Sequence, residues 1–207
     1  PCVRYADDIV LLARSERAAK RLLETSTKYL EETLRLTVNR EKSKVSSVFA
    51  IRNFKFLGFA LGRNGGGTYI RVHPKSWKKM KGKLKSLSSR RHVQSVIPAL
   101  YRIRVYMRGW LNYYGIAAMK NAIEELNGWL YHRIRMCIWK MWKRTRSKMK
   151  YLIKLGVPEE LAYMAANSRR KYWFVSNTVA VKMGLTKEIL ARKGYYDLAD
   201  AYRQVRV

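Results

Sequence analysis

The sequence predicts an α+β segment followed by an all-helical one. Before His73, apolar and polar residues alternate in short runs separated by turn residues, which is typical of β-hairpins. After Pro74, apolar residues recur every three or four positions, and this spacing predicts amphipathic helices. We therefore place a boundary near His73 and expect three parts, at residues 1–73, 74–150 and 151–207.

The first hairpin is expected where the stretch YADD (5–8) interrupts an apolar run, with Asp7 and Asp8 at its tip. The apolar residues expected to share one face are Val3, Tyr5, Ile9 and Leu11. Ionised carboxylates in apolar surroundings are costly unless a cation compensates them, and a metal ion would do so. The alternative is an ordinary Asp-Asp turn, because aspartate is common in turns.

The rest of the first part alternates between helix and strand patterns. Ser15 is a suitable cap for a helix that runs to about Leu34 with an apolar stripe. Residues 36–45 (LTVNREKSKV) predict a short strand, a turn and another strand. Residues 54–72 predict a second hairpin, in which three glycines of the turn RNGGGT supply positive φ angles.

The second part predicts a small antiparallel helical bundle. Its three apolar stripes span residues 77–87, 96–111 and 123–141, with short connections between them. Two further helices are expected at residues 159–167 and 186–204. Because the periodicity is helical throughout, we expect almost no strand after the boundary.

The charge is strongly positive and unevenly distributed. Of the formal net charge of +30, residues 71–150 carry +19, with 21 Lys and Arg against two acids. Such a charge repels itself unless a polyanion neutralises it, which favours nucleic acid as the partner. A membrane is not expected, because no run approaches the roughly 18 apolar residues of a spanning helix. There is no signal peptide, and Cys2 and Cys137 cannot form a disulfide framework, so we expect a reducing, cytoplasmic location.

Aromatic residues interleave with the cations of the second part. They are Trp110, Tyr113, Tyr114, Trp129, Tyr131, Trp139 and Trp142. Such rings can stack on unpaired bases, as in many RNA-binding proteins. The alternative is that they form the core, since aromatics at helical spacing are commonly buried.

The order strand, YADD, strand, helix resembles the active-site hairpin of reverse transcriptases, whose palm carries a Tyr-x-Asp-Asp motif. The stretch NREKSKV (39–45) is similar to the lysine-bearing turn after the palm helix of that family. The stretch FLGF (56–59) is similar to its primer-grip hairpin, and the basic helices that follow resemble a thumb.

The later segments closely resemble the thumb and maturase domain of bacterial group II intron-encoded reverse transcriptases. They are RGWLNYYG (108–115), NGWLYHRIRMCIWKMWKR (127–144), KLGVPEELAYMAANSRRKYWFVSN (154–177) and LARKGYYDL (190–198). The resemblance implies a fold of partial palm with two β-hairpins and a helix (1–73), thumb bundle (74–150) and remainder of the maturase (X) domain (151–207). It also implies that the fingers and the first half of the palm were encoded upstream, and that this is the class without an endonuclease domain.

The resemblance further implies RNA-directed DNA synthesis with two Mg²⁺ ions. Asp7 would ligate metal together with an upstream aspartate, with Asp8 as a supporting or second ligand. Tyr5 would lie against the primer end, where Ala6 leaves room for the backbone. The other residues implied at the primer and nucleotide are Lys42 or Lys44 near the triphosphate, and Leu57 and Gly58 in the grip. Without the upstream part, we expect the chain to be inactive alone.

The second implied activity is binding of intron RNA to promote splicing and retrohoming. The candidate cations are Lys78, Lys79, Arg133, Arg135, Lys140, Lys143, Arg144, Arg146, Arg169, Arg170 and Lys171. Trp173 is a candidate ring beside them, although Tyr172 and Trp173 could instead anchor their segment to the core. The other implied partners are an RNA template/DNA primer duplex, dNTP, a DNA target and the N-terminal half of the protein as a separate chain.

Two alternatives remain at this point. A non-catalytic RNA-binding splicing factor derived from a reverse transcriptase would share the basic helices, but such proteins tend to lose the acids that Asp7 and Asp8 retain. A ribosomal-type basic protein would not account for the Asp pair between apolar runs. Metal-dependent primer extension separates these hypotheses.

Overall fold

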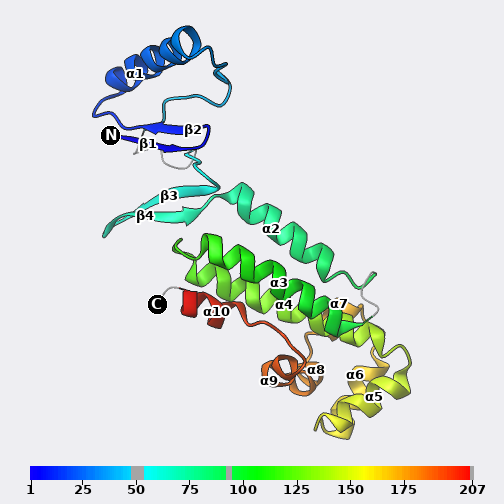
Figure 1. The fold of residues 1–207 in the computed structure, drawn as a ribbon. Helices are drawn as coiled ribbons and strands as arrows, with labels where there is room; N and C mark the ends of the chain where they lie inside the picture. Colours follow the sequence, from blue (N-terminus) through cyan, green and yellow to red (C-terminus); the bar gives the residue numbers. More distant parts are fainter. Residues whose placement is uncertain (48–53, 92–94, 206–207) are drawn as a thin grey trace. The chain divides into compact units, whose positions relative to one another are not determined.

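A computed structural model describes residues 1–47, 54–91 and 95–205. The chain divides into two compact units, Pro1–His73 and Pro74–Val207, each of which is described by itself. The predicted α+β fold class is confirmed, with two small antiparallel hairpins and many helices (Figure 1).

The first hairpin forms where the sequence predicts it. Strand β1 (Cys2–Tyr5) pairs antiparallel with β2 (Asp8–Leu11), and the two residues between them make the turn. Ala6 adopts a φ of +50°, as the first central residue of a tight hairpin turn must. The turn therefore places Tyr5 directly opposite Asp8.

The predicted apolar face of this hairpin is wrong. Val3 lies opposite Val10, whereas Ile9 lies opposite Arg4. Residues opposite each other share a face, and side chains alternate along a strand, so Val3 and Ile9 lie on different faces. The reason is the two-residue turn, which sets the register independently of the apolar pattern.

Helix α1 (Glu16–Lys28) begins at the predicted cap, where the backbone N–H of Ala18 donates to Ser15 Oγ at 3.2 Å. It continues as one π-helical turn, η1 (Tyr29–Thr33), so the helical region ends close to the expected position. None of the residues of α1 and η1 is buried.

The two short strands predicted within residues 36–45, all of which the structure describes, do not form. Asn39 organises a turn there instead. Its backbone carbonyl accepts from the N–H groups of Lys42 and Ser43, and its side chain also accepts from Lys42 at 3.1 Å. An asparagine side chain that bonds nearby backbone in this way competes with strand pairing.

The second hairpin is confirmed, as β3 (Phe59–Asn64) paired with β4 (Gly67–Val72). Of the three glycines expected to supply positive φ, only Gly67 does so, at +114°. Gly62 has a different role, because a Cβ there would lie 2.4 Å from Cζ of Tyr69 on the opposite strand. The tyrosine ring therefore occupies the space that the glycine leaves.

Three long helices form the core of the second unit. They are α2 (Pro74–Leu87), α3 (Val96–Tyr114) and α4 (Lys120–Met141). Helix α3 packs against both α2 and α4 (Figure 1). The predicted apolar stripes supply its fully buried side chains, among them Met80, Leu84, Leu100, Ile103, Met107, Leu111, Ile123, Leu126, Leu130 and Ile134.

Shorter helices follow. They are α5 (Thr145–Lys154), α6 (Glu159–Asn167), α7 (Tyr172–Val175), α8 (Val179–Gly184), α9 (Lys187–Arg192) and α10 (Leu198–Val205). Helices α5, α6 and α8 pack together, α7 packs on α4, and α10 packs on α3 and α4. The helix predicted at 159–167 is confirmed. The single helix predicted at 186–204 is wrong, because Gly194 (φ +92°) separates α9 from α10. Within the described ranges, no helix has the length and apolar character to cross a membrane.

Candidate carboxylate hairpin and nucleic-acid interface

The turn of the first hairpin presents two neighbouring carboxylates. Asp7 lies in the turn and Asp8 begins β2, opposite Tyr5. The guanidinium of Arg4 donates from Nε to the carbonyl of Ala6 at 3.0 Å, which supports the turn. The strained turn at Ala6 and the hydrogen bond from Arg4 therefore fix the backbone position of both aspartates.

The apolar side chains expected around these carboxylates are present, but they are exposed and do not bury the acids. Every residue of β1 and β2 is exposed except Val10, which is half-buried, and Tyr5 is 63% exposed. The physical reason is that neither face of the two-stranded sheet is covered by other described residues. The apolar side chains around the acids are therefore exposed as well.

The two aspartates suit a hard divalent cation but do not complete a site for one. Carboxylate oxygens are the ligands that Mg²⁺ prefers, and Asp7 and Asp8 provide them side by side in the sequence. In the part of the chain that the structure describes, no three His, Cys, Asp or Glu residues group together as a metal site. A Mg²⁺ ion held by this pair would take its further ligands from water or from groups other than a third described His, Cys, Asp or Glu.

The other predicted primer and nucleotide residues lie elsewhere in the first unit. Lys42 and Lys44 are exposed on the turn organised by Asn39. Leu57 and Gly58 form a tight turn, with φ of +51° and +82°, and the flanking residues 56 and 59 exchange two backbone hydrogen bonds across it. A positive φ is the reason that glycine fits position 58, and close approach to a primer stays a prediction.

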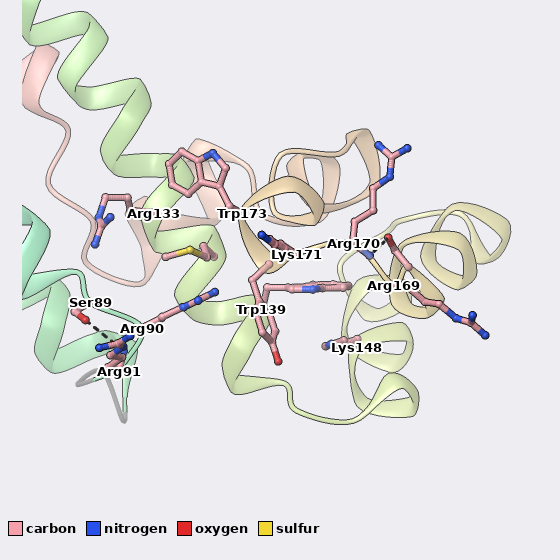
Figure 2. Close-up of a pocket in the computed structure, with 13 residues that line it drawn as sticks. Ser89, Arg90, Arg91, Arg133, Trp139, Lys148, Arg169, Arg170, Lys171 and Trp173 are labelled. Carbon is pink, nitrogen blue, oxygen red and sulfur yellow. Dashed lines mark hydrogen bonds between the residues drawn. The ribbon is translucent and has the colours of Figure 1, made fainter.

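The second unit contains a basic pocket of about 790 Å³ (Figure 2). It is lined by the segment after α2, by α4, α5 and α7, and by the segment before α7. Its thirteen lining residues are Ser89, Arg90, Arg91, Arg133, Met136, Trp139, Lys148, Ser168, Arg169, Arg170, Lys171, Tyr172 and Trp173. We call this set the basic pocket; it holds seven cations and no acid.

The structure brings together four of the predicted RNA-binding cations and adds three that the sequence did not single out. The four are Arg133, Arg169, Arg170 and Lys171, and the added ones are Arg90, Arg91 and Lys148. The other seven predicted cations do not line the pocket. Five of them are exposed, namely Lys78, Lys79, Lys143, Arg144 and Arg146, and two are half-buried, namely Arg135 and Lys140.

Arg133 braces the pocket wall rather than projecting into solvent. Its Nε donates to Ser88 Oγ at 2.7 Å, and its Nη2 donates to the carbonyls of Lys85 and Ser88 at 2.9 and 3.0 Å. Burial lowers the pKa of Arg133. Lys140 has a similar role, because its ammonium donates to the carbonyl of Arg90 at 2.9 Å. Together these two side chains fix the segment that carries the cations after α2.

Aromatic rings pack among the cations. The ammonium of Lys148 lies 5.0 Å from the ring centroid of Trp139 and 5.5 Å from that of Tyr172, and Arg90 lies 5.4 Å from the latter. Burial lowers the pKa of Lys148. A cation over a ring face is attracted electrostatically by the ring, and this attraction helps to hold the ammonium of Lys148 in place.

Trp173 is partly anchored and partly exposed. Its ring stacks on His132 with centroids 3.5 Å apart, and His132 Nε2 donates to its carbonyl at 2.7 Å. The tryptophan nevertheless remains 42% exposed, whereas Trp139 is 2% exposed. Of the interleaved aromatics, Trp110, Tyr131 and Trp139 are buried, so the core alternative holds for these three.

The cations of the basic pocket are not neutralised by carboxylates. Ion pairs within the described ranges join Lys20 to Glu16, Lys28 to Glu32, Arg40 to Glu31 and Arg203 to Asp200. None of these residues lines the pocket. Seven cations gathered around one cavity without an acid create a strongly positive potential, which attracts an anion.

Comparison with known protein families gives two matches in separate parts of the chain. Residues 1–61 match the family described as reverse transcriptase (RNA-dependent DNA polymerase). Residues 77–155, which include α2, α3 and α4, match the group II intron, maturase-specific domain. No curated protein matches the chain.

The first match puts the carboxylate hairpin in the reverse transcriptase class. With the maturase-specific match after it, the chain belongs to the group II intron reverse transcriptase/maturase family, as the sequence resemblance predicted.

Proposed function

We propose that this chain contributes to RNA-directed DNA synthesis by two-metal nucleotidyl transfer and also binds intron RNA to promote splicing and retrohoming. The observation that carries this proposal is the presence, in one chain, of the paired carboxylates on the reverse transcriptase hairpin and an uncompensated basic pocket in the maturase region. Two-metal nucleotidyl transfer uses paired carboxylates, and binding of a structured RNA uses cations that carboxylates do not neutralise.

In the proposed synthesis, the hairpin positions oxygen ligands and the primer end. Asp7 and Asp8 would hold Mg²⁺, which supplies Lewis-acid stabilisation of the phosphoryl group when bound. Tyr5 lies opposite Asp8 and is exposed, so it is available to contact a primer terminus. Ala6 presents only a methyl group beside that position. Lys42 or Lys44 would attract the dNTP, with Leu57 and Gly58 gripping the primer.

The exposed apolar side chains around the carboxylates support a further partner, the upstream half of the palm. Val3, Ile9 and Leu12 are large apolar side chains with half or nearly half of their surface in solvent. Large apolar side chains exposed on both faces of one small hairpin favour an interaction site. We propose that the N-terminal half of the same protein covers it and supplies the missing metal ligand.

The proposed RNA activity requires no chemistry by the protein. Binding to the folded form of the intron RNA stabilises that form by mass action. The pocket cations and the exposed Lys143, Arg144 and Arg146 would neutralise RNA phosphates. The exposed cations outside the pocket would also hold the template/primer duplex and the DNA target during retrohoming.

A non-catalytic RNA-binding splicing factor remains the second candidate. The exposed position of Asp7 and Asp8 favours it, because an exposed acid pair needs no metal for its own stability. Both candidates predict RNA binding, and only the first predicts polymerisation.

Primer extension with Mg²⁺ tests the proposal in the protein that also carries the upstream palm. We expect Asp7→Asn to abolish extension, because an amide cannot replace a charged metal ligand, while RNA binding and splicing assistance stay nearly unchanged. An intact protein that binds RNA but extends no primer would support the second candidate. Equal loss of extension and splicing in Asp7→Asn would contradict the proposed division of labour.

A further inference from the structure

The basic pocket has the size of a small-ligand site rather than of a surface that receives a helix. Its volume of about 790 Å³ falls within the range of roughly 300 to 1,000 Å³ typical of ligand pockets. Five segments of the chain line it, and together they form a concave, half-open site. A duplex is recognised mainly along its outer backbone and shallow groove, which calls for an open surface.

The cations surround the pocket from two ends (Figure 2). Arg91 lies at one end, and Arg90 reaches from that end toward Tyr172, 5.4 Å from its ring centroid. Arg169 and Arg170 lie at the other end with their side chains directed apart, and Lys171 lies between the ends beside Trp139. Cations beside exposed and buried rings match a nucleotide of a single strand, which offers both a phosphate and, when unpaired, a free base face.

An exposed ring lies among the charges. Trp173 has His132 stacked against it and still exposes 42% of its surface. A ring fixed on one side by a neighbour is prepared to accept a base on the other, because little mobility is lost on binding. Trp139 is buried beneath Lys148 and cannot serve in this way.

We propose that the basic pocket binds an unpaired nucleotide of RNA, with its base against Trp173 and an adjoining phosphate at the pocket cations. This inference rests on the proposed function that the second unit binds RNA, and it specifies which form of RNA this site takes. The pocket thus selects loops, bulges or single-stranded ends, while the exposed cations outside it attract any RNA phosphate.

Binding of two RNA probes by the full 207-residue chain tests the inference. One probe is a labelled single-stranded oligoribonucleotide and the other is a blunt RNA duplex with the same number of phosphates, each measured by fluorescence anisotropy at one salt concentration. We expect Trp173→Leu to bind the single strand about tenfold more weakly, because the stacking contact is lost. Duplex binding should change by less than about twofold, and Trp173→Phe should restore most of the single-strand affinity.

Two further variants make the result decisive. Lys171→Ala removes an exposed pocket cation and should weaken single-strand binding more than duplex binding, without depending on the folding of Trp173→Leu. Arg146→Ala removes an exposed cation on α5 outside the lining and should weaken both probes alike.

The two levels of the proposal fail in different ways. If the wild-type chain binds RNA but Trp173→Leu and Lys171→Ala weaken both probes equally, or weaken neither, the unpaired-nucleotide inference is overturned and RNA binding stands. If the wild-type chain binds neither probe, RNA binding by this chain is overturned with it.

Discussion

Asn127 and Asp197 lie 70 positions apart in the sequence and are joined by a hydrogen bond of 3.0 Å from Asn127 Nδ2 to Asp197 Oδ1. The other oxygen of Asp197 accepts from the hydroxyl of Tyr131 at 3.1 Å. The amide oxygen of Asn127 in turn accepts from the hydroxyl of Tyr195 and the backbone N–H of Leu198. A single network on α4 therefore fixes the start of α10.

Asp197→Ala should destabilise the second unit substantially. Asp197 Oδ1 also accepts from the backbone N–H groups of Ala199 and Asp200 at the start of α10, so the substitution removes a helix cap as well as the acceptor of Asn127 Nδ2. Asn127 is 4% exposed. Loss of a cap and an unsatisfied buried amide together cost about 2 to 4 kcal/mol. Urea unfolding measures the loss, and Asp197→Asn should lose less because it keeps an acceptor. An unchanged midpoint in Asp197→Ala would contradict the bracing role.

The same carboxylate should make stability depend on acid pH. Partial burial raises the pKa of Asp197, but the hydrogen bonds from Asp200, Asn127, Tyr131 and Ala199 outweigh it and lower the pKa below its ordinary value of 3.8. The unfolded chain then binds the proton more tightly, so this contribution is complete above pH 3.8 and is lost as the pH falls through the lower folded pKa. Urea midpoints measured from pH 5 downward should fall more steeply in the wild type than in Asp197→Ala.

His132 should add a second pH dependence nearer neutrality. Burial lowers its pKa from 6.5, the hydrogen bond to the Trp173 carbonyl opposes this, and the nearby Arg135 and Lys182 lower it further. Because the folded pKa is the lower one, the unfolded chain takes up the proton first, and stability falls as the pH drops below 6.5 toward the folded pKa. The urea midpoint should therefore be lower at pH 5.5 than at pH 7.5. His132→Phe, which keeps a stacking ring but cannot titrate, should show a flat midpoint across this window; an unchanged slope would exclude His132 as the cause.

The sequence predicted the core of the second unit well because its signal is local. Residues such as Leu100, Ile103 and Met107 recur at helical spacing, and a long helix buries whichever face is apolar. The hairpin face was mispredicted because register depends on turn length: the apolar pattern grouped Val3 with Ile9, but the turn at Ala6 pairs Ile9 with Arg4.

The basic pocket was only partly predictable for a different reason. Arg90, Arg91 and Lys148 lie in separate segments, and tertiary packing alone brings them to the cavity with the predicted Lys171. The composition predicted that this region is positively charged, but it did not predict which cations make structural hydrogen bonds. Arg133 is one of these cations because its donors bond carbonyls and a hydroxyl near the end of α2, which a sequence pattern does not reveal.

Arg133→Lys should destabilise the second unit although it preserves the charge. A lysine ammonium lacks the planar fork that bonds Ser88 Oγ and the carbonyls of Lys85 and Ser88 at once. We expect a loss of about 1 to 3 kcal/mol in the free energy of unfolding, measured by urea denaturation. The exposed Lys143→Ala should change it by less than about 0.5 kcal/mol. Equal, small effects in both variants would show that the fork contributes little.

A side chain at Gly58 should destabilise the turn between Phe56 and Phe59. Gly58 has a φ of +82°, so Gly58→Ala is strained by about 1 kcal/mol or more. Amide hydrogen exchange at residues 56 and 59, whose N–H groups bond across the turn, should become faster. Gly65→Ala is the matched control, because Gly65 does not have a positive φ and a Cβ there would meet no atom within 4 Å. Faster exchange in both variants alike would point to a general loosening of the unit instead.

RNA affinity should fall steeply with salt, because the cations of the second unit displace condensed counterions from RNA phosphates. For six to ten phosphate contacts, the association constant is expected to drop by about 10³ to 10⁵ between 50 and 200 mM salt. Replacing one contacting cation, as in Lys171→Ala or Arg146→Ala, should reduce the slope of log affinity against log salt by about one. Anisotropy titrations of the full chain at four or five salt concentrations provide the slopes. Asp200→Asn, which changes charge on α10 at a residue already paired with Arg203, is a control that should leave the slope unchanged. A wild-type slope near zero would be incompatible with binding through phosphates and would exclude nucleic acid as the partner of the basic pocket.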